Sequence, residues 1–300
     1  MTATDPIEAA TMTAPLVRAS RVSRRYGAIL ALDEVSLDIH AGELVGLLGP
    51  NGAGKSTLIN IFTGLRRPEA GSVELGGGDP RDRATRQIMG VTPQQTALPE
   101  QWRVAELVDF VAAHYPSPLD RSEVLARFDL QDLRDRQIGG LSGGQQRRLA
   151  VALAFTGRPQ VVFLDEPTTG LDVEARHALW QGIRAYHADG GTVLLTSHYL
   201  EEIEALARRV VVLHRGRVIA DAPLTDVRGL IGLKRVSLTC ATLPALPGVA
   251  GIEHDGDRTH LLTADADELV RDLTASGADF HDLEVSAASL EDAFLAITAR

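Results

Sequence analysis

The sequence predicts an α/β fold with a largely parallel sheet, followed by a small α+β unit. Short apolar runs that resemble buried strands alternate with segments of helical spacing as far as residue 213. A glycine-rich loop joins one of these runs, residues 43–48, to a helix that ends near Gly64. From residue 229 the order changes to strand-like pieces around a helix, which indicates a separate unit.

The individual elements follow from periodicity and from breaker residues. Residues 16–22 and 35–39 are strand-like, with a turn at Tyr26-Gly27 between them, and residues 72–75 form another strand signal. Residues 102–136 have helical spacing that a pair of prolines interrupts. We further expect helices over 147–155, 173–188, 200–207, 265–275 and 290–298, and strands over 161–164, 192–196, 210–213, 217–220, 236–240, 251–254, 259–263 and 280–285.

Composition excludes several classes of protein. The net charge of −10 argues against a general nucleic-acid binder and against a polybasic membrane anchor. No apolar run reaches the ~18–20 residues that span a bilayer, and residues 1–15 look like a disordered leader rather than a signal peptide. Cys240, the single cysteine, cannot form an intrachain disulfide, which suits a reducing cytosol.

A phosphate-binding loop is the strongest motif. The pattern G-x-x-x-x-G-K-[ST] stands between an expected strand and an expected helix, which is the context that the motif requires. Its backbone amides can surround a phosphate chain, while Lys55 reaches the β and γ phosphates and the Ser56 hydroxyl ligates Mg²⁺. The candidate binding residues are Gly49, Pro50, Asn51, Gly52, Ala53, Gly54, Lys55, Ser56 and Thr57.

A pair of carboxylates follows the apolar run of residues 161–164. This position places Asp165 and Glu166 at the carboxyl end of a buried strand, where ligands bind in open α/β sheets. Asp165 is a candidate Mg²⁺ ligand and Glu166 can contact an attacking water. Two adjacent carboxylates beside a triphosphate would repel it without a metal, so the pair implies Mg²⁺.

A second anion-seeking segment is Leu141-Ser142-Gly143-Gly144-Gln145. Ser142 is a helix N-cap residue, and two glycines at a helix N-terminus expose amides and the positive end of the helix dipole. Because the first loop already accounts for one phosphate chain, this segment suggests contact with ATP held by another copy of the chain. An ordinary capped helix is the alternative interpretation.

These three motifs, in this order, resemble the ATP-binding subunit of ATP-binding cassette (ABC) transporters. Residues 141–145 match the signature motif of that family letter for letter, and the resemblance covers residues 16–225. It implies a P-loop cassette over residues 16–228, with an antiparallel β subdomain and a helical subdomain beside the mostly parallel sheet. Residues 229–300 would then form a C-terminal accessory α+β domain.

The resemblance also implies roles for single residues. Tyr26 would stack on adenine, and His198 would act as the switch near the γ-phosphate. Gln94 would sense Mg²⁺ and contact the membrane subunit, with the neighbouring Gln95 as the alternative, and Leu171-Asp172 would cross to the partner subunit.

Three kinds of cassette protein remain possible. Residues 165–172 resemble the variant common in drug and lipid exporters, and residues 289–295 resemble the closing helix of ATPases paired with ABC-2-type permeases. We therefore expect the motor of an exporter. The alternatives are an importer motor and, less favoured, a soluble cassette ATPase that acts on ribosomes or DNA. The soluble ATPase is less favoured because ribosome-acting members of the family usually carry two cassettes, whereas this chain has one phosphate loop and one signature. The sequence does not reveal the transported compound.

The same resemblance implies two chains bound head to tail around two ATP molecules with Mg²⁺. Each ATP would touch Lys55, Ser56 and Asp165 of one chain and Ser142, Gly143 and Gly144 of the other, with Gln145 a further candidate binding residue of the same segment. Glu166 would be the catalytic base. The expected partner is an integral membrane permease, with no nucleic acid, and the expected location is the cytoplasmic face of the cell membrane.

Overall fold

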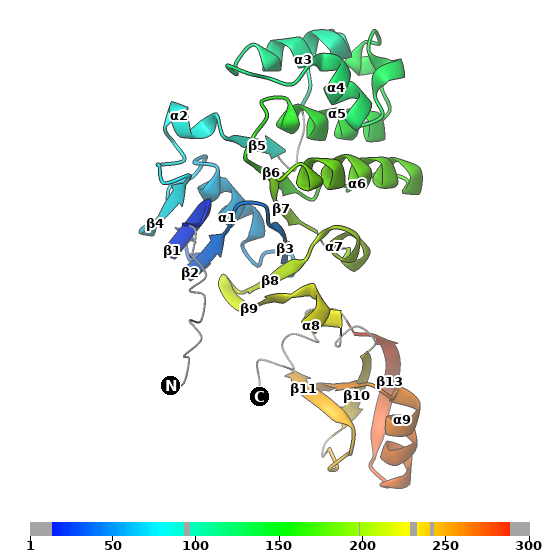
Figure 1. The fold of residues 1–300 in the computed structure, drawn as a ribbon. Coiled ribbons are helices and arrows are strands. Elements are labelled where there is room, and N and C mark those ends of the chain that lie inside the picture. The colour runs from blue at the N-terminus through cyan, green and yellow to red at the C-terminus, as the bar shows by residue number, and fades with distance from the viewer. Residues whose placement is uncertain (1–13, 93–96, 198, 229–232, 241–242, 289–300) are drawn as a thin grey trace, which may run out of the picture.

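The structure is a computed structural model that describes residues 14–92, 97–197, 199–228, 233–240 and 243–288. These residues form three β-sheets with helices beside and between them (Figure 1). No helix in the described ranges is both long and apolar enough to cross a bilayer. Most of the expected leader and the whole of the expected helix over residues 290–298 lie outside the described residues.

The central sheet has six strands in the order β5-β6-β7-β3-β8-β9. Neighbouring strands from β5 to β8 run parallel, whereas β9 runs antiparallel to β8 at the edge. Every residue of β3, β6 and β7 is buried, which explains why their apolar residues run on without alternation. The strands are β3 (Leu44–Leu48), β5 (Met89–Thr92), β6 (Val161–Asp165), β7 (Thr192–Thr196), β8 (Arg209–His214) and β9 (Arg217–Pro223).

A second sheet is antiparallel and has the strand order β2-β1-β4. Its strands are β1 (Val17–Tyr26), β2 (Ile29–Ile39) and β4 (Ala70–Leu75). Helix α1 (Lys55–Phe62) belongs to the apolar core that joins this sheet to the central one, and the rings of Phe62 and Phe163 stack there with centroids 5.9 Å apart. Apolar packing therefore fixes α1, and with it the loop that precedes it.

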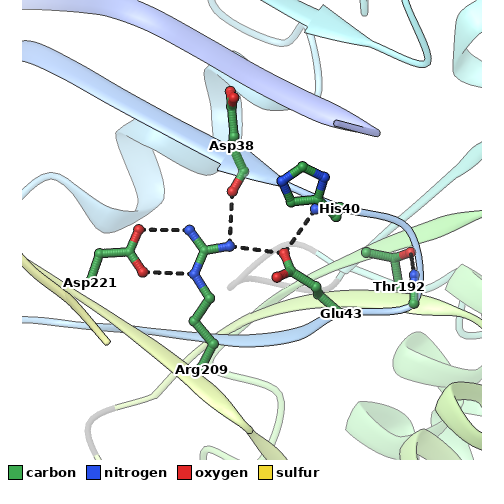
Figure 2. Close-up of polar contacts among 7 residues, drawn as sticks. Asp38, His40, Glu43, Thr192, Arg209 and Asp221 are labelled. Atoms are coloured by element: carbon green, nitrogen blue, oxygen red, sulfur yellow. Dashed lines mark hydrogen bonds and ion pairs between the residues drawn. The ribbon is translucent and has the colours of Figure 1, made fainter. Parts of the chain in front are cut away.

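A polar network around Arg209 ties the antiparallel sheet to the central sheet (Figure 2). The Arg209 guanidinium pairs with Asp221 at 2.6 Å and with Glu43 at 2.9 Å, and it donates to the carbonyl oxygen of Asp38 at 3.0 Å. The Glu43 carboxylate also accepts the backbone N–H of His40 at 2.8 Å. The network thus joins the end of β2, the approach to β3, and the strands β8 and β9.

Helices cover the opposite face of the central sheet. Alternate residues of β6 face the two sides: Val161 and Phe163 belong to the core with α1, whereas Val162 and Leu164 belong to the core with the helices. The rings of Phe128 and Phe155 pack within this second core at 4.8 Å. Its helices are α3 (Val104–Ala112), α4 (Arg121–Arg127), α5 (Gly143–Phe155), α6 (Val173–Ala188) and α7 (Leu200–Leu206), with 3₁₀ turns η1 (Gln131–Leu133) and η2 (Ile138–Gly140).

The C-terminal part forms its own sheet with the strand order β11-β12-β10-β13. Helix α9 packs on one face through a small apolar core, against which the side chain of Cys240 is half-buried. A short helix, α8, precedes this part of the chain (Figure 1). The elements are α8 (Leu224–Arg228), β10 (Lys234–Cys240), β11 (Val249–Asp255), β12 (Arg258–Thr263), α9 (Ala266–Ala275) and β13 (Phe280–Ala287).

The predicted fold class is confirmed, and most expected elements appear with shifted ends. The sequence did not predict α2 (Arg83–Arg86), β5 or α8. All three are short. Strand β5 has only four residues, one of them a glycine, so its strand character depends on pairing with β6.

Candidate nucleotide-binding site

The loop between β3 and α1 forms its curve through glycines that have no room for a side chain. Gly49 has φ 146°, and a Cβ there would lie 2.1 Å from the carbonyl oxygen of Leu213. Gly54 has φ 107°, and its Cβ would lie 2.4 Å from the carbonyl oxygen of Ala31. The loop is therefore pressed against β8 and β2 in a backbone conformation that other residues rarely adopt.

A cavity of about 430 Å³ opens at this loop. Lys55, at the first position of α1, is buried, and its ammonium group donates to the carbonyl oxygens of Gly49 at 2.5 Å and Pro50 at 3.0 Å. A buried ammonium group beside helix-terminal amides gives the cavity a positive character that suits phosphate. The cavity is lined by Ala31, Pro50, Asn51, Gly52, Gly54, Lys55, Ser56, Thr57 and Glu166.

The two predicted carboxylates lie where β6 ends. Asp165 is the last residue of the strand and is buried, and its Oδ1 accepts a hydrogen bond from the Thr196 hydroxyl at 2.6 Å. The same Thr196 oxygen accepts the backbone N–H of Glu166 at 2.9 Å. Thr196 ends β7, which lies between β6 and β3, so the strand order brings both carboxylates to the edge that carries the phosphate loop.

Glu166 has an unusual backbone. Its φ is 48°, in the left-handed region that residues other than glycine enter at a cost. Glu166 also lines the cavity of the phosphate loop, so the structure brings together the two strongest motifs of the sequence. A strained residue at a cavity is the pattern expected of a functional site.

Arg147 of α5 holds the turn at residues 165–167 by hydrogen bonds. It was not among the site residues predicted from the sequence. Its buried guanidinium donates to the carbonyl oxygens of Asp165 at 2.7 Å, Glu166 at 2.9 Å and Pro167 at 3.2 Å. Burial lowers the pKa of Arg147, and the nearby carboxylates of Asp165 and Glu166 oppose that shift. An arginine within an otherwise apolar helix face was the one available signal for this contact.

The predicted signature segment caps α5. The Ser142 hydroxyl accepts the N–H of Gln145 at 3.2 Å, and the Gln145 side chain accepts the N–H of Ser142 at 3.0 Å, which forms a capping box. Ser142 and Gly143 are exposed, and a Cβ on Gly143 would meet nothing within 4 Å. This segment does not line the cavity of the phosphate loop, so one chain does not bring its two anion-seeking elements together there.

Comparison with known proteins identifies this arrangement. A sequence profile described as ABC transporter matches residues 32–169. Daunorubicin resistance ATP-binding protein DrrA2 of Streptomyces coeruleorubidus is 36% identical, over 94% of this chain and 94% of its own length. The chain belongs to the ABC transporter family. Nod factor export ATP-binding protein I of Burkholderia thailandensis is 40% identical over 71% of this ABC protein and 72% of its own length.

Solved structures agree with this assignment. The ATP-binding subunit of an ABC transporter covers 71% of this chain and 92% of its own, with 31% identity and a TM-score of 0.65. A dimeric ATP-binding cassette in a post-hydrolysis state, bound to ADP and Pi, covers 69% of this chain and 98% of its own, with 28% identity and a TM-score of 0.62. The ABC protein described here is thus an ATP-binding, ATP-hydrolysing subunit, and the predicted resemblance to drug-resistance exporter ATPases is confirmed.

Of the other residues to which the family resemblance gives a role, the structure describes some and not others. Tyr26 ends β1 and is two-fifths exposed, with the Arg24 guanidinium 5.0 Å from its ring centroid. The Asp172 carboxylate caps α6 by accepting the N–H of Ala175 at 2.8 Å. Gln94, its alternative Gln95, and His198 lie outside the described residues.

Proposed function

We propose that this ABC protein is the motor of an exporter and drives efflux of a drug-like or lipid-like compound through a separate membrane permease. The relative named for daunorubicin resistance supports this proposal, because it matches over nearly the whole chain, including the C-terminal sheet. The relative named for Nod factor export also supports it, over 71% of this chain. The observation that carries the proposal is this match of the C-terminal part together with the cassette.

The proposed permease is of the ABC-2 type and contacts the helical part of the cassette. Three rings gather on α3 and beside it: Trp102 and Phe110 meet edge to face at 5.2 Å, and Phe110 contacts His114 at 4.9 Å. Half of the Phe110 side chain is exposed. An exposed aromatic cluster of this kind fits a protein partner, and a chain bound to a permease would sit at the inner face of the membrane.

The proposed working form is a head-to-tail pair of chains. In each site, Lys55 and Ser56 of one copy would bind the phosphates of ATP while the Ser142–Gly144 segment of the other copy covers them. Support comes from the separation of the two elements within one chain, from the exposure of Ser142 and Gly143, and from the dimeric relative. Leu171 and Asp172, beside the first turn of α6, would lie near the contact between copies.

The residues present suit Mg²⁺. Ser56 and Asp165 offer a hydroxyl and a carboxylate, which are hard oxygen ligands. The described residues contain no group of three or more His, Cys, Asp or Glu side chains that could hold a metal ion. Mg²⁺ prefers this arrangement, since it binds through one or two protein ligands and the phosphates of its nucleotide. When bound there, it would neutralise phosphate charge; Gln94 is a further proposed ligand.

Within the proposed mechanism, Glu166 acts as general base toward the attacking water. Its place in the wall of the phosphate cavity supports this role. His198 would hold the γ-phosphate, and Tyr26 would stack on the adenine ring. Lys55 would stabilise the negative charge that develops on the phosphate oxygens.

Exchange of the proposed base tests this function. Glu166→Gln keeps the size of the side chain but removes its basicity, so ATP should bind without turnover and hold two chains together. We expect a stable dimer by light scattering with ATP and Mg²⁺, and at least ~100-fold slower hydrolysis. Glu123→Gln, on the exposed surface of α4, is the matched control and should behave as wild type. Monomers with full turnover in the Glu166 variant would reject the proposal.

Export itself requires the permease. Cells that express the chain with its membrane permease should accumulate less of a fluorescent amphiphilic drug than cells that express the Glu166→Gln variant with the same permease. Equal accumulation in both would remove the support for drug efflux without affecting the ATPase assignment.

A further inference from the structure

A fully buried carboxylic acid lies behind the nucleotide site. Glu202 is the third residue of α7 and has no exposed surface. Its neighbour Glu201 is exposed, so the first turn of the helix presents one acidic side chain to solvent and one to the interior. Nothing in the proposed mechanism uses Glu202.

The Glu202 carboxyl group connects three segments that are distant in sequence. Its Oε2 accepts the hydroxyl of Thr168 at 2.9 Å, and its Oε1 accepts the indole N–H of Trp180 at 3.2 Å. The Ser197 hydroxyl, which donates to the carbonyl oxygen of Tyr199 at 3.2 Å, lies near enough to act on this carboxyl group as well. Thr168 lies in the turn after β6, Trp180 lies on α6, and Ser197 directly follows β7.

The groups that donate to the Glu202 carboxyl group are uncharged: a hydroxyl and an indole N–H. Burial raises the pKa of Glu202, although the hydroxyl groups of Ser197 and Thr168 and the indole N–H of Trp180 oppose the shift. Two cations act on it electrostatically: Arg147, whose guanidinium donates to the carbonyl oxygens after β6, and Arg176, which forms its ion pair with Glu201 at 3.3 Å. Burying a carboxylic acid without a direct cationic partner is costly, and an apolar residue of equal size would be the more stabilising choice.

Two of the three contacts lead to the reacting groups. Thr168 follows Glu166 by two residues, in the turn whose carbonyl oxygens Arg147 holds. Ser197 follows Thr196, whose hydroxyl oxygen binds both Asp165 and the backbone of Glu166. The Ser197 oxygen also accepts the N–H of Tyr199 at 2.9 Å, on the other side of position 198. The contacts of Glu202 therefore reach both segments that carry the proposed base and the proposed switch residue.

We propose that Glu202 is a positioning residue for ATP hydrolysis, which fixes the turn after Glu166 against the segment between β7 and α7 through Thr168 and Ser197. The inference rests on the proposed roles of Glu166 and position 198. Glu202 itself does not line the phosphate cavity, and its effect on the reaction passes through these two neighbours.

The test measures kcat, KM for ATP and Tm of the full chain for a set of matched variants. Glu202→Gln keeps the volume but cannot accept from Thr168 and Trp180 on two equivalent oxygens, so we expect kcat to fall about tenfold or more with KM within about twofold of wild type. Glu201→Gln is the control on the same helical turn and should leave kcat unchanged. Because Gln fills the same space, we expect Tm to stay at or above the wild-type value.

Double-mutant cycles separate positioning from simple packing. Thr168→Val removes one hydroxyl and should lower kcat. In the double variant with Glu202→Gln, the loss of kcat should be smaller than the product of the two single losses, because both changes break the same contact. Trp180→Phe removes the indole N–H that α6 donates to Glu202, which lies outside the two segments named above, and should change Tm more than kcat. If Glu202→Gln and Thr168→Val multiply in kcat, or if kcat falls only as Tm falls, the proposal is wrong.

This outcome is distinct from failure of the proposed function. If Glu166→Gln retains turnover, the assignment of the base fails, whatever Glu202→Gln shows. If Glu166→Gln is inactive while Glu202→Gln keeps full kcat, the proposed function stands and the positioning role is rejected.

Discussion

The two anion-seeking helix ends of this chain are constructed in opposite ways. At the start of α1, Lys55 is buried, and the glycines of the loop are pressed against neighbouring backbone. At the start of α5, Ser142 is exposed and bonds only to its own helix, and the space around Gly143 is open. The first end is a complete pocket within one chain. The second has the geometry of a surface that acquires its ligand from outside.

The largest effect that this comparison predicts is the loss of the first end. Lys55→Ala removes the buried ammonium group and its bonds to the carbonyl oxygens of Gly49 and Pro50. ATP hydrolysis should fall ~1,000-fold, and nucleotide binding by the isolated chain, measured by calorimetry, should fall with it. Retained hydrolysis would place the active site elsewhere in the chain.

A change at the second end should spare binding and remove turnover. Gly143→Asp places a carboxylate where a partner's phosphate is proposed to lie, yet its Cβ meets no neighbour within 4 Å, so the fold should tolerate it. We expect hydrolysis to fall ~100-fold with the affinity of the single chain for ATP unchanged.

Gly143→Ala, which adds the Cβ without the charge, is the matched control and should keep most of the activity. If the aspartate variant binds ATP more weakly as a monomer, the N-termini of α1 and α5 do not act independently, and the contrast drawn between them is wrong.

The buried carboxyl group of Glu202 on α7, outside both helix ends, predicts a pH effect on stability. The pKa of Glu202 is raised above its ordinary value of 4.5 by burial. Above pH 4.5 the unfolded chain therefore releases this proton before the folded chain does, so stability falls as pH rises from there through the folded pKa.

Glu202→Gln should remove this contribution. As pH rises through the pKa of Glu202, the wild type should lose unfolding free energy relative to the variant, by about 1.4 kcal/mol for each unit by which folding raises that pKa. Urea denaturation at pH 5 and pH 8 measures it. An unchanged difference between the two pH values would show that the carboxyl group titrates as it does in water.

The smallest predicted effect concerns the cap of α5. Ser142→Ala loses the acceptor for the N–H of Gln145 and should lower stability by about 1 kcal/mol. Ser142→Asn restores an acceptor and should recover that loss. Thermal unfolding compares the three chains, and equal midpoints would mean that the capping box contributes nothing measurable.

The fold class and the motifs of the candidate site could be predicted from the sequence. The phosphate loop, the Asp165-Glu166 pair and the Ser142 cap were predicted because each depends on adjacent residues and on one strand or helix end. Thr196, Arg147 and Glu202 were not predicted, because their contacts arise from the strand order β6-β7-β3 and from packing of α5 and α7. No local spacing contains that information. Strand β5 was missed for the same reason, since its pairing with β6 defines it.

The left-handed turn at Glu166 has a consequence for how this enzyme could be stabilised. Glycine would relieve the backbone at this position, so Glu166→Gly removes a local penalty of about 1 kcal/mol while it deletes the carboxylate. If Glu166 is the base, as proposed, a selection for heat resistance alone would therefore favour an inactive protein with glycine at this position. Only a screen that also demands turnover would retain the acidic side chain against the preference of its own main chain.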